Sequence, residues 1–138
     1  MTSDSNIKDL VLVDFDDRGE AGRVARVTFN NPEKRNALGV GGKQRFIDVI
    51  TELRHDDTLR ALVITGAGDK SFVGGSNLAD MRHYTPADGH TASTKTHYAC
   101  DAVRNFPVPV IARINGYCFG SGMEIAAAAD MRVAADHA

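Results

Sequence analysis

Two glycine-rich segments hold the residues whose types and spacing best suit chemistry. Residues 66–78 contain Ser76 and four glycines, and residues 115–124 contain Ser121 within a Gly-x-Gly pattern and end on a glutamate. Glycine lets a backbone come close to a ligand and point its N–H groups into open space. The first N–H groups of a helix are unpaired and carry a partial positive charge. Two such turns at one edge of a sheet can bind a single oxyanion, although a glycine-rich turn more often only connects a strand to a helix.

Glu124 has two interpretations. The run Ser121-Gly-Met-Glu124 fits a capping box, in which the glutamate side chain bonds back to the Ser121 N–H and begins a helix. Alternatively, Glu124 is a carboxylate that moves a proton in a binding site. The local sequence favours the cap, and it leaves both interpretations open.

Strands and helices alternate along the chain around these segments. β-Branched and aromatic runs predict a pair of strands at residues 10–15 and 24–29, joined by a turn. Residues 59–65 are expected to form a strand buried on both faces, and residues 110–114 another buried strand. A further strand is expected to begin at residue 131. This alternation predicts an α/β fold with a parallel sheet.

Helical periodicity is clearest at residues 42–55. Phe46 and the apolar residues after it recur at helical spacing, with Lys43 and other charged residues on the other side of the helix. A short amphipathic piece is expected at residues 78–84 and an alanine-rich helix at 122–129. Residues 86–90 are predicted to form a mobile loop, followed by a helix that runs to residue 105.

Composition and charge limit the classes of protein to which this chain can belong. The 138 residues carry a net charge of −2, which with 43% hydrophobic residues indicates one soluble domain spanning residues 1–138. The basic residues are scattered, so no nucleic-acid or membrane partner is expected, and the absence of a leader-like segment predicts a cytoplasmic protein. Cys100 and Cys118 are expected to be reduced. The five histidines show no metal-ligand spacing, so no metal site is predicted.

Four short stretches resemble the successive signatures of one enzyme family. Asn-Asn-Pro-Glu-Lys-Arg-Asn-Ala-Leu at 30–38, Ser-Phe-Val-Gly-Gly-Ser-Asn-Leu at 71–78 and Pro-Val-Ile-Ala-Arg-Ile-Asn-Gly at 109–116, followed by Gly-Ser-Gly-Met-Glu at 120–124, are similar to the enoyl-CoA hydratase/isomerase, or crotonase, family. Their order and separations fit, and the resemblance extends from about residue 10 to residue 138.

The resemblance implies a fold and an assembly. The fold would be the ClpP/crotonase spiral of ββα units with two sheets, incomplete at its C-terminus because family subunits are nearly twice this long. The chain is accordingly interpreted as the N-terminal part of a subunit. Family subunits usually assemble as homotrimers or as dimers of trimers.

The resemblance also implies an activity. The family binds an acyl-CoA thioester and stabilises its enolate, adding water to a 2-enoyl-CoA or isomerising it. Coenzyme A is part of the substrate, and no permanently bound cofactor is expected. The N–H groups of Ser76 and Ser121 match the family's oxyanion hole and Glu124 its catalytic carboxylate, so the family pattern favours catalysis over the cap.

Further positions match the family's CoA-binding segments. The two cations of the first segment can pair with a CoA phosphate, although a solvated Lys-Arg pair in a turn is equally expected. The matching residues are Lys34, Arg35, Ala37, Leu38, Gly74, Ser76, Asn77 and Leu78.

Three departures from the family pattern leave the reaction open. Asn77 stands where the family usually has Asp, and Ser121 stands where it usually has Gly. The second glutamate of the family's hydratases would lie beyond Ala138. Hydratase and isomerase therefore stay open, as do a thioester hydrolase, a decarboxylase, a C–C hydrolase and a non-catalytic acyl-CoA-binding protein.

Overall fold

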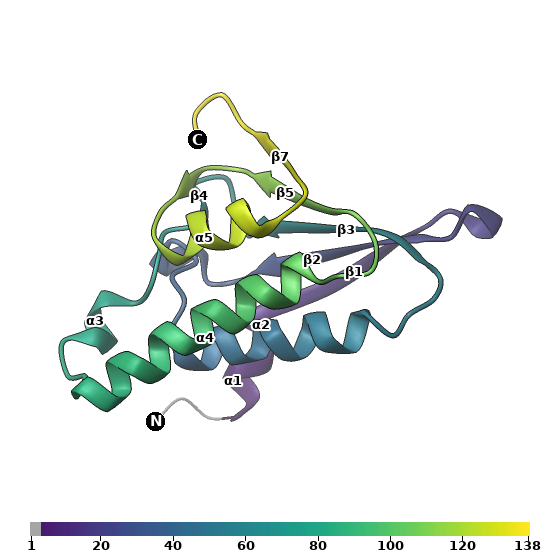
Figure 1. Cartoon of the computed structure of the whole chain (residues 1–138). Helices are drawn as coiled ribbons and strands as arrows, with labels where there is room; N and C mark the ends of the chain where they lie inside the picture. Colours follow the sequence, from purple (N-terminus) through teal and green to yellow (C-terminus); the bar gives the residue numbers. More distant parts are fainter. Residues whose placement is uncertain (1–3) are drawn as a thin grey trace.

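A five-stranded sheet carries helices on one of its faces, and a second sheet of two short strands lies at one end (Figure 1). The computed structural model describes residues 4–138. The elements in chain order are α1 (Asp4–Lys8), β1 (Val11–Asp17), η1 (Gly19–Ala21), β2 (Arg23–Phe29), η2 (Pro32–Lys34), α2 (Val40–Leu53), β3 (Leu59–Gly66), β4 (Ser71–Val73), α3 (Leu78–Met81), α4 (Pro86–Arg104), β5 (Val110–Ile114), β6 (Tyr117–Cys118), α5 (Ser121–Ala128) and β7 (Met131–Ala134).

The main sheet has the strand order β1-β2-β3-β5-β7. Strands β1 and β2 are antiparallel, in a register that runs from Val11 opposite Phe29 to Asp17 opposite Arg23. All the other neighbours in this sheet are parallel. The expected opening strand pair and the predicted α/β parallel sheet are therefore confirmed.

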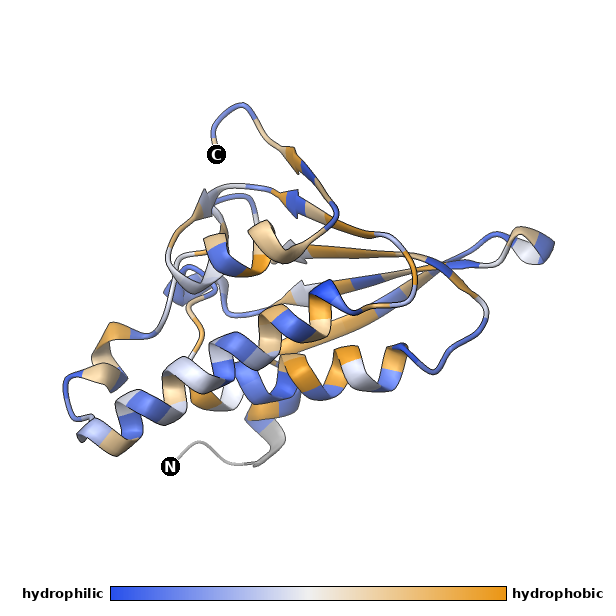
Figure 2. Cartoon of the chain, in the orientation of Figure 1, coloured by the Kyte–Doolittle hydropathy of each residue, from blue (hydrophilic) through white to orange (hydrophobic). Residues whose placement is uncertain are grey.

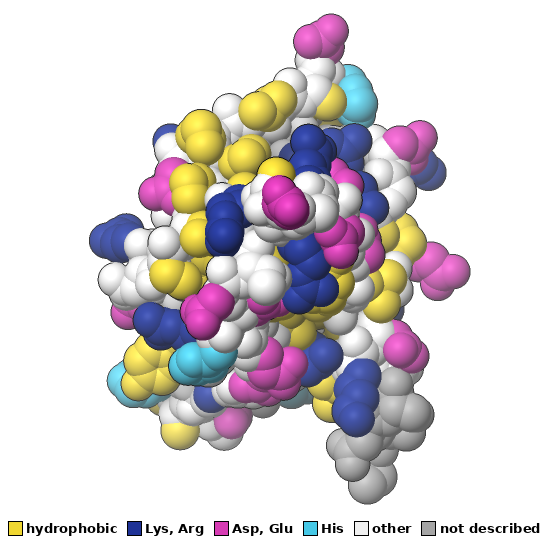
Figure 3. Space-filling view, turned by 90° about the vertical axis from the view of Figure 1, so that its right-hand side faces the viewer, with side chains coloured by type: hydrophobic (Ala, Val, Ile, Leu, Met, Phe, Trp, Pro, Cys, Tyr) yellow, Lys and Arg dark blue, Asp and Glu magenta, His cyan; other side chains and the backbone are white. Residues whose placement is uncertain are grey.

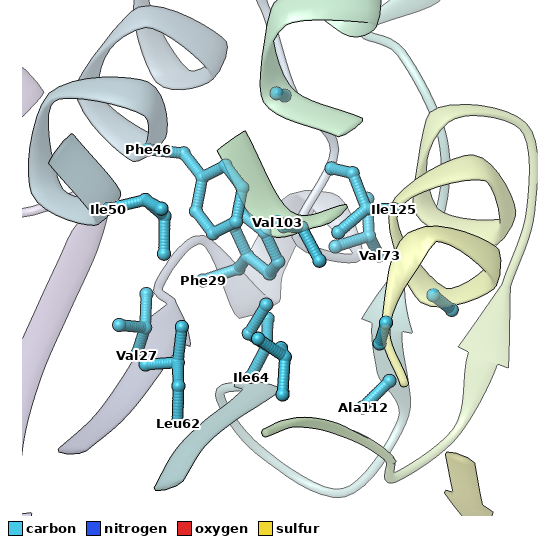
Figure 4. Close-up of a cluster of buried hydrophobic side chains, with 14 of the residues drawn as sticks. Val27, Phe29, Phe46, Ile50, Leu62, Ile64, Val73, Val103, Ala112 and Ile125 are labelled. Atoms are coloured by element: carbon cyan, nitrogen blue, oxygen red, sulfur yellow. The ribbon is translucent and has the colours of Figure 1, made fainter. Parts of the chain in front are cut away.

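The core lies between this sheet and the helices (Figure 4). Phe46 of α2 packs against Phe29 of β2 with ring centroids 4.9 Å apart, and Phe72 meets Phe29 edge-on at 5.9 Å. Ile50 of α2 and Val103 of α4 point into the same cluster in Figure 4. Burial of this apolar surface is the main force that fixes α2 and α4 on the sheet.

The opposite face of the sheet is only partly covered. Along β3, Leu62 and Ile64 are fully buried, whereas Ala61 and Val63 are half-buried. Figure 1 shows α2, α4 and α5 on the same side of the sheet, and Figure 2 shows apolar residues along the strands. The prediction that residues 59–65 are buried on both faces therefore holds only in part for the described chain: Leu59 and Thr65 are buried as well, but the middle of one face is only half-buried, because the large helices all pack on the other side.

The predicted loop at residues 86–90 is wrong, because these residues form the first turn of α4. Thr85 is the N-cap residue, and its hydroxyl accepts from the Asp88 N–H while the Asp88 carboxylate accepts from the Thr85 N–H. This is a capping box built with aspartate in place of the usual glutamate. Hydrogen bonds from Thr85 lower the pKa of Asp88.

Removing the cap should destabilise the chain. Thr85→Ala leaves the Asp88 N–H in the first turn of α4 without this acceptor, and we expect a loss of about 0.5–2 kcal/mol in the free energy of unfolding. Thr91→Ala is the matched control, since the Thr91 hydroxyl only donates back to the Ala87 carbonyl within the helix. Urea unfolding followed by circular dichroism measures both, and equal stabilities would contradict the role of the cap.

Charges of both signs are mixed over the surface that surrounds the end of the opening strand pair. Figure 3 shows Lys and Arg side chains interspersed with Asp and Glu on this face. Arg26 of β2 pairs with Asp14 of β1 at 2.6 Å, and Arg18 pairs with Asp16 at 2.6 Å. Within residues 4–138, no helix has the length and apolar character needed to cross a membrane.

Candidate active site

A cavity of about 760 Å³ opens between α4, α5 and the two glycine-rich turns. It is lined by residues of the two turns and of α2, α3, α4 and α5, together with Leu38 and Tyr84. The lining residues are Leu38, Lys43, Gly74, Gly75, Ser76, Leu78, Met81, Tyr84, Gly89, Ala92, Ser93, Thr96, His97, Cys100, Arg104, Gly120, Ser121, Glu124, Ala127 and Ala128.

The two glycine-rich turns lie side by side because short strands pair within them. Strand β4 is parallel to β6, with Ser71 opposite Tyr117 and Val73 opposite Cys118. Gly75 has φ 110° and Gly120 has φ 50°, conformations that favour glycine. A Cβ on Gly120 would lie 3.6 Å from the Gly75 Cα, so the two backbones approach closely. This contact places the next residues of both turns at one wall of the cavity.

Those next residues are Ser76 and Ser121, and both present unpartnered backbone N–H groups. Among the described residues, neither N–H donates to a protein acceptor, although the neighbouring Asn77 and Gly122 N–H groups both do. Ser121 is the first residue of α5, where an N–H has no intrahelical partner. Two free donors on adjacent turns can accept one oxyanion between them.

A preceding segment holds the first turn in place. The Arg35 carbonyl accepts from the Gly74 N–H at 2.8 Å, and the Leu38 N–H donates to the Gly75 carbonyl at 2.9 Å. The Leu38 carbonyl in turn accepts from the Asn77 N–H at 3.1 Å. Backbone bonds on both sides of Ser76 therefore fix the direction of its N–H.

The capping box considered for Glu124 is not formed. The N-cap of α5 is Gly120, whose carbonyl accepts from the Glu124 N–H at 3.0 Å, and no side chain caps this helix. The Ser121 hydroxyl is buried without a partner in the described chain. Because Gly120 is the N-cap, α5 begins one residue earlier than the expected capping box would place it. The Glu124 side chain is exposed at the cavity.

Lys43 is a cavity residue that the sequence did not predict. It was expected on the charged side of its helix, but it is only 3% exposed and lies on the buried face of α2. Its Nζ donates to the Ser76 Oγ at 3.0 Å and to the Ala92 carbonyl at 3.4 Å. Burial lowers the pKa of Lys43, and the negative charge of Glu124 partly opposes this effect. A position one turn before Phe46 was the available signal, since residues three apart share a helix face.

The residues expected to bind CoA divide into two groups. Leu38, Gly74, Ser76 and Leu78 line the cavity, together with Ser121 and Glu124. The remaining four, Lys34, Arg35, Ala37 and Asn77, do not line it.

The residues outside the cavity have other contacts. The Arg35 guanidinium lies over the Tyr117 ring, 5.6 Å from its centroid. Asn77 is the N-cap residue of α3, accepting from the Ala79 N–H and donating to the Asp80 carboxylate. Lys34 is exposed. Asn77, which stands where the family usually has Asp, therefore still supplies a side-chain oxygen that caps α3.

Cys100 and His97 of α4 also line the cavity, as do the titratable side chains of Tyr84 and Arg104. Burial raises the pKa of the Cys100 thiol, and the charge of Glu124 adds to this effect. Cys100 and Cys118 are both free thiols, as predicted. No group of His, Cys, Asp and Glu within residues 4–138 is arranged to hold a metal ion.

Comparison with known proteins identifies the family. The family model described as enoyl-CoA hydratase/isomerase matches residues 19–138. The chain belongs to the enoyl-CoA hydratase/isomerase family. A short-chain-enoyl-CoA hydratase of Clostridium acetobutylicum is 35% identical over 117 residues, which cover 85% of this chain and 45% of that protein. An (E)-benzylidenesuccinyl-CoA hydratase of Thauera aromatica is 38% identical over 120 residues, covering 83% and 44%.

Solved structures of enoyl-CoA hydratases confirm the fold expected for this chain. An enoyl-CoA hydratase from Bacillus anthracis superposes with a TM-score of 0.84 at 27% identity, covering 91% of this chain and 48% of that one. The chain therefore has the crotonase fold and spans less than half the length of these relatives. It corresponds to the N-terminal part of them, as the sequence predicted.

Proposed function

We propose that this chain binds an acyl-CoA thioester in its cavity and stabilises the enolate of that thioester. The carbonyl oxygen accepts hydrogen bonds from the N–H groups of Ser76 and Ser121. The observation that carries this proposal is the pair of unpartnered donors on two turns held together by β4 and β6. Negative charge that develops on the oxygen is stabilised by donors already in position, and one such donor is worth about 2.7–4 kcal/mol.

Glu124 is the proposed acid and base. Its side chain lines the same cavity and is not used as a helix cap. It activates water for addition to a 2-enoyl-CoA, or carries a proton between carbons in isomerisation. The hydratase names of the relatives favour the first of these reactions. Assays of both reactions on one enoyl-CoA panel separate them.

Coenzyme A enters as part of the substrate. Leu38, Gly74 and Leu78 contribute cavity wall next to Ser76. Ala37 and Asn77 belong to the same two segments, and the exposed cations of Lys34 and Arg35 pair with CoA phosphates where the ligand leaves the cavity. We further propose a homotrimer or dimer of trimers, as the family implies, which light scattering measures directly.

The proposed function is tested by titrating the chain with acetoacetyl-CoA and recording the absorbance spectrum. The enolate of this ligand absorbs distinctly from its keto form, so we expect an enolate band that saturates as the oxyanion hole fills. Coenzyme A without an acyl group is the control and should give no band. A spectrum that stays that of free acetoacetyl-CoA would overturn the proposal.

A further inference from the structure

The contact between Ser76 and Lys43 is not needed for enolate stabilisation. That role uses the Ser76 backbone, whereas the contact joins the Ser76 hydroxyl to a buried amine 3.0 Å away. The Ala92 carbonyl, 3.4 Å from the same amine, holds it from the side of α4. The amine thus lies within hydrogen-bond reach of a hydroxyl that lines a cavity of about 760 Å³.

We propose that Ser76 and Lys43 form a nucleophile and base that hydrolyse an acyl-CoA thioester through an acyl ester on the Ser76 hydroxyl. The inference rests on the proposed function, because the same two N–H groups hold the thioester oxygen. A nucleophile whose own N–H forms part of the oxyanion hole is the arrangement of serine hydrolases, and Ser–Lys pairs are among their variants.

The lack of an ion pair and the lowered pKa of Lys43 both favour its role as a base. No carboxylate pairs with it in the described chain, where the ion pairs are Arg18–Asp16, Arg23–Asp56 and Arg26–Asp14. Burial lowers the pKa of Lys43 and so favours the neutral amine, which can take a proton. A lysine held as a structural cation would instead be expected to have a close anionic partner.

The reaction balances without a further reactant besides water. The Ser76 oxygen bonds to the thioester carbonyl carbon as its proton moves to the Lys43 amine, and the carbonyl electrons move to the oxygen in the hole. When the carbonyl re-forms, the carbon–sulfur bond breaks and the CoA sulfur takes the proton from Lys43. Water then attacks the ester, giving a proton to Lys43. The carbon–oxygen bond to Ser76 then breaks, the Ser76 oxygen takes the proton from Lys43, and a carboxylic acid leaves.

The test uses the whole chain and butanoyl-CoA, a saturated thioester that cannot be hydrated. Released CoA is measured by chromatography, and the acyl ester is detected by intact-protein mass spectrometry after acid quench. We expect release of CoA together with a protein species heavier by one butanoyl group. Ser76→Ala should abolish both signals, and Lys43→Met should lower the rate of CoA release by about 10²-fold or more.

Matched controls separate this chemistry from a structural role. Thr91→Ala removes the hydroxyl of an exposed α4 residue that does not line the cavity, and Lys95→Met changes a lysine that bonds Gln44 instead of a serine. Both should release CoA at the wild-type rate. Ser76→Ala keeps its backbone N–H, so it should still give the enolate band with acetoacetyl-CoA.

The pH profile gives a second readout of Lys43. Release of CoA should rise as the pH rises through the lowered pKa of the amine, because the neutral amine is the base. Glu124 and Cys100 face this amine, and Tyr84, His97 and Arg104 line the same cavity and can titrate as well. The pH profile of the Lys43→Met chain therefore serves as the reference. The rise should be missing from that reference.

Each outcome decides between the two proposals. An enolate band without CoA release or ester overturns the Ser76–Lys43 pair and leaves the proposed function standing. CoA release that persists in Ser76→Ala, or a rate unchanged in Lys43→Met, also overturns the pair. Absence of both the enolate band and the ester overturns both proposals.

Discussion

Glu124→Gln is expected to lower turnover of a 2-enoyl-CoA by about 10²–10⁴-fold, the usual contribution of a positioned acid or base. The amide has nearly the same shape as the carboxylate but cannot accept and return a proton at neutral pH. Glu124 is exposed at the cavity and caps no helix, so the change should leave the fold intact. Loss of enoyl absorbance reports hydration, and chromatography of the products reports isomerisation.

Binding of acetoacetyl-CoA by the Glu124→Gln chain distinguishes the loss of an acid or base from damage to the site. Because the proposed oxyanion donors are backbone groups of other residues, the Glu124→Gln chain should still give the enolate band with acetoacetyl-CoA. Asp101→Asn is the matched control, since it removes the same charge from an exposed position of α4 that does not line the cavity. Turnover by Glu124→Gln equal to that of the wild type would exclude Glu124 as the acid or base.

Ser121→Pro should lower turnover by about 10²–10³-fold by removing one oxyanion donor. Proline has no N–H, and Ser121 is the first residue of α5, the helical position that proline fits best. Gly120 before it has φ 50° and ψ −123°, outside the helical region that proline disfavours in its neighbour. The substitution therefore removes a donor with little cost to the helix.

Two measurements make the Ser121→Pro result specific. The enolate band of acetoacetyl-CoA should weaken with turnover, and urea unfolding should show a stability near that of the wild type. Ser121→Ala loses the unpartnered hydroxyl but keeps the N–H, so its turnover should fall much less than that of Ser121→Pro. If both variants lost turnover equally, the hydroxyl would matter and the backbone donor would not.

Much of the fold could be predicted from the sequence, because its long elements have clear periodicity. The strand at residues 110–114 has the observed bounds, and the helix predicted at 42–55 is found at Val40–Leu53. The short strands β4 and β6 were missed, since two or three residues inside glycine-rich turns carry no pattern. Their pairing depends on residues far apart in the chain, such as Ser71 and Tyr117.

The site could be predicted only in part. Motif order pointed to Ser76, Ser121 and Glu124, and the structure brings all three to one cavity. Lys43 was predicted to lie on the charged side of its helix because lysine is usually exposed. Its spacing of three residues from Phe46 instead placed it on the buried face. What buries it is the packing of α4 against α2, which lets the amine reach the Ala92 carbonyl.

The burial of Lys43 also affects how the chain responds to selection for heat resistance. Because the pKa of this amine is lowered from 10.5 in the folded chain, the unfolded chain holds the proton more tightly. The free energy of unfolding therefore rises with pH across the interval between the two pKa values, and at neutral pH the fold bears the cost of taking the amine out of water. A laboratory screen for thermostable variants should replace Lys43 with an apolar residue such as methionine, whereas a screen for thioester turnover should retain it.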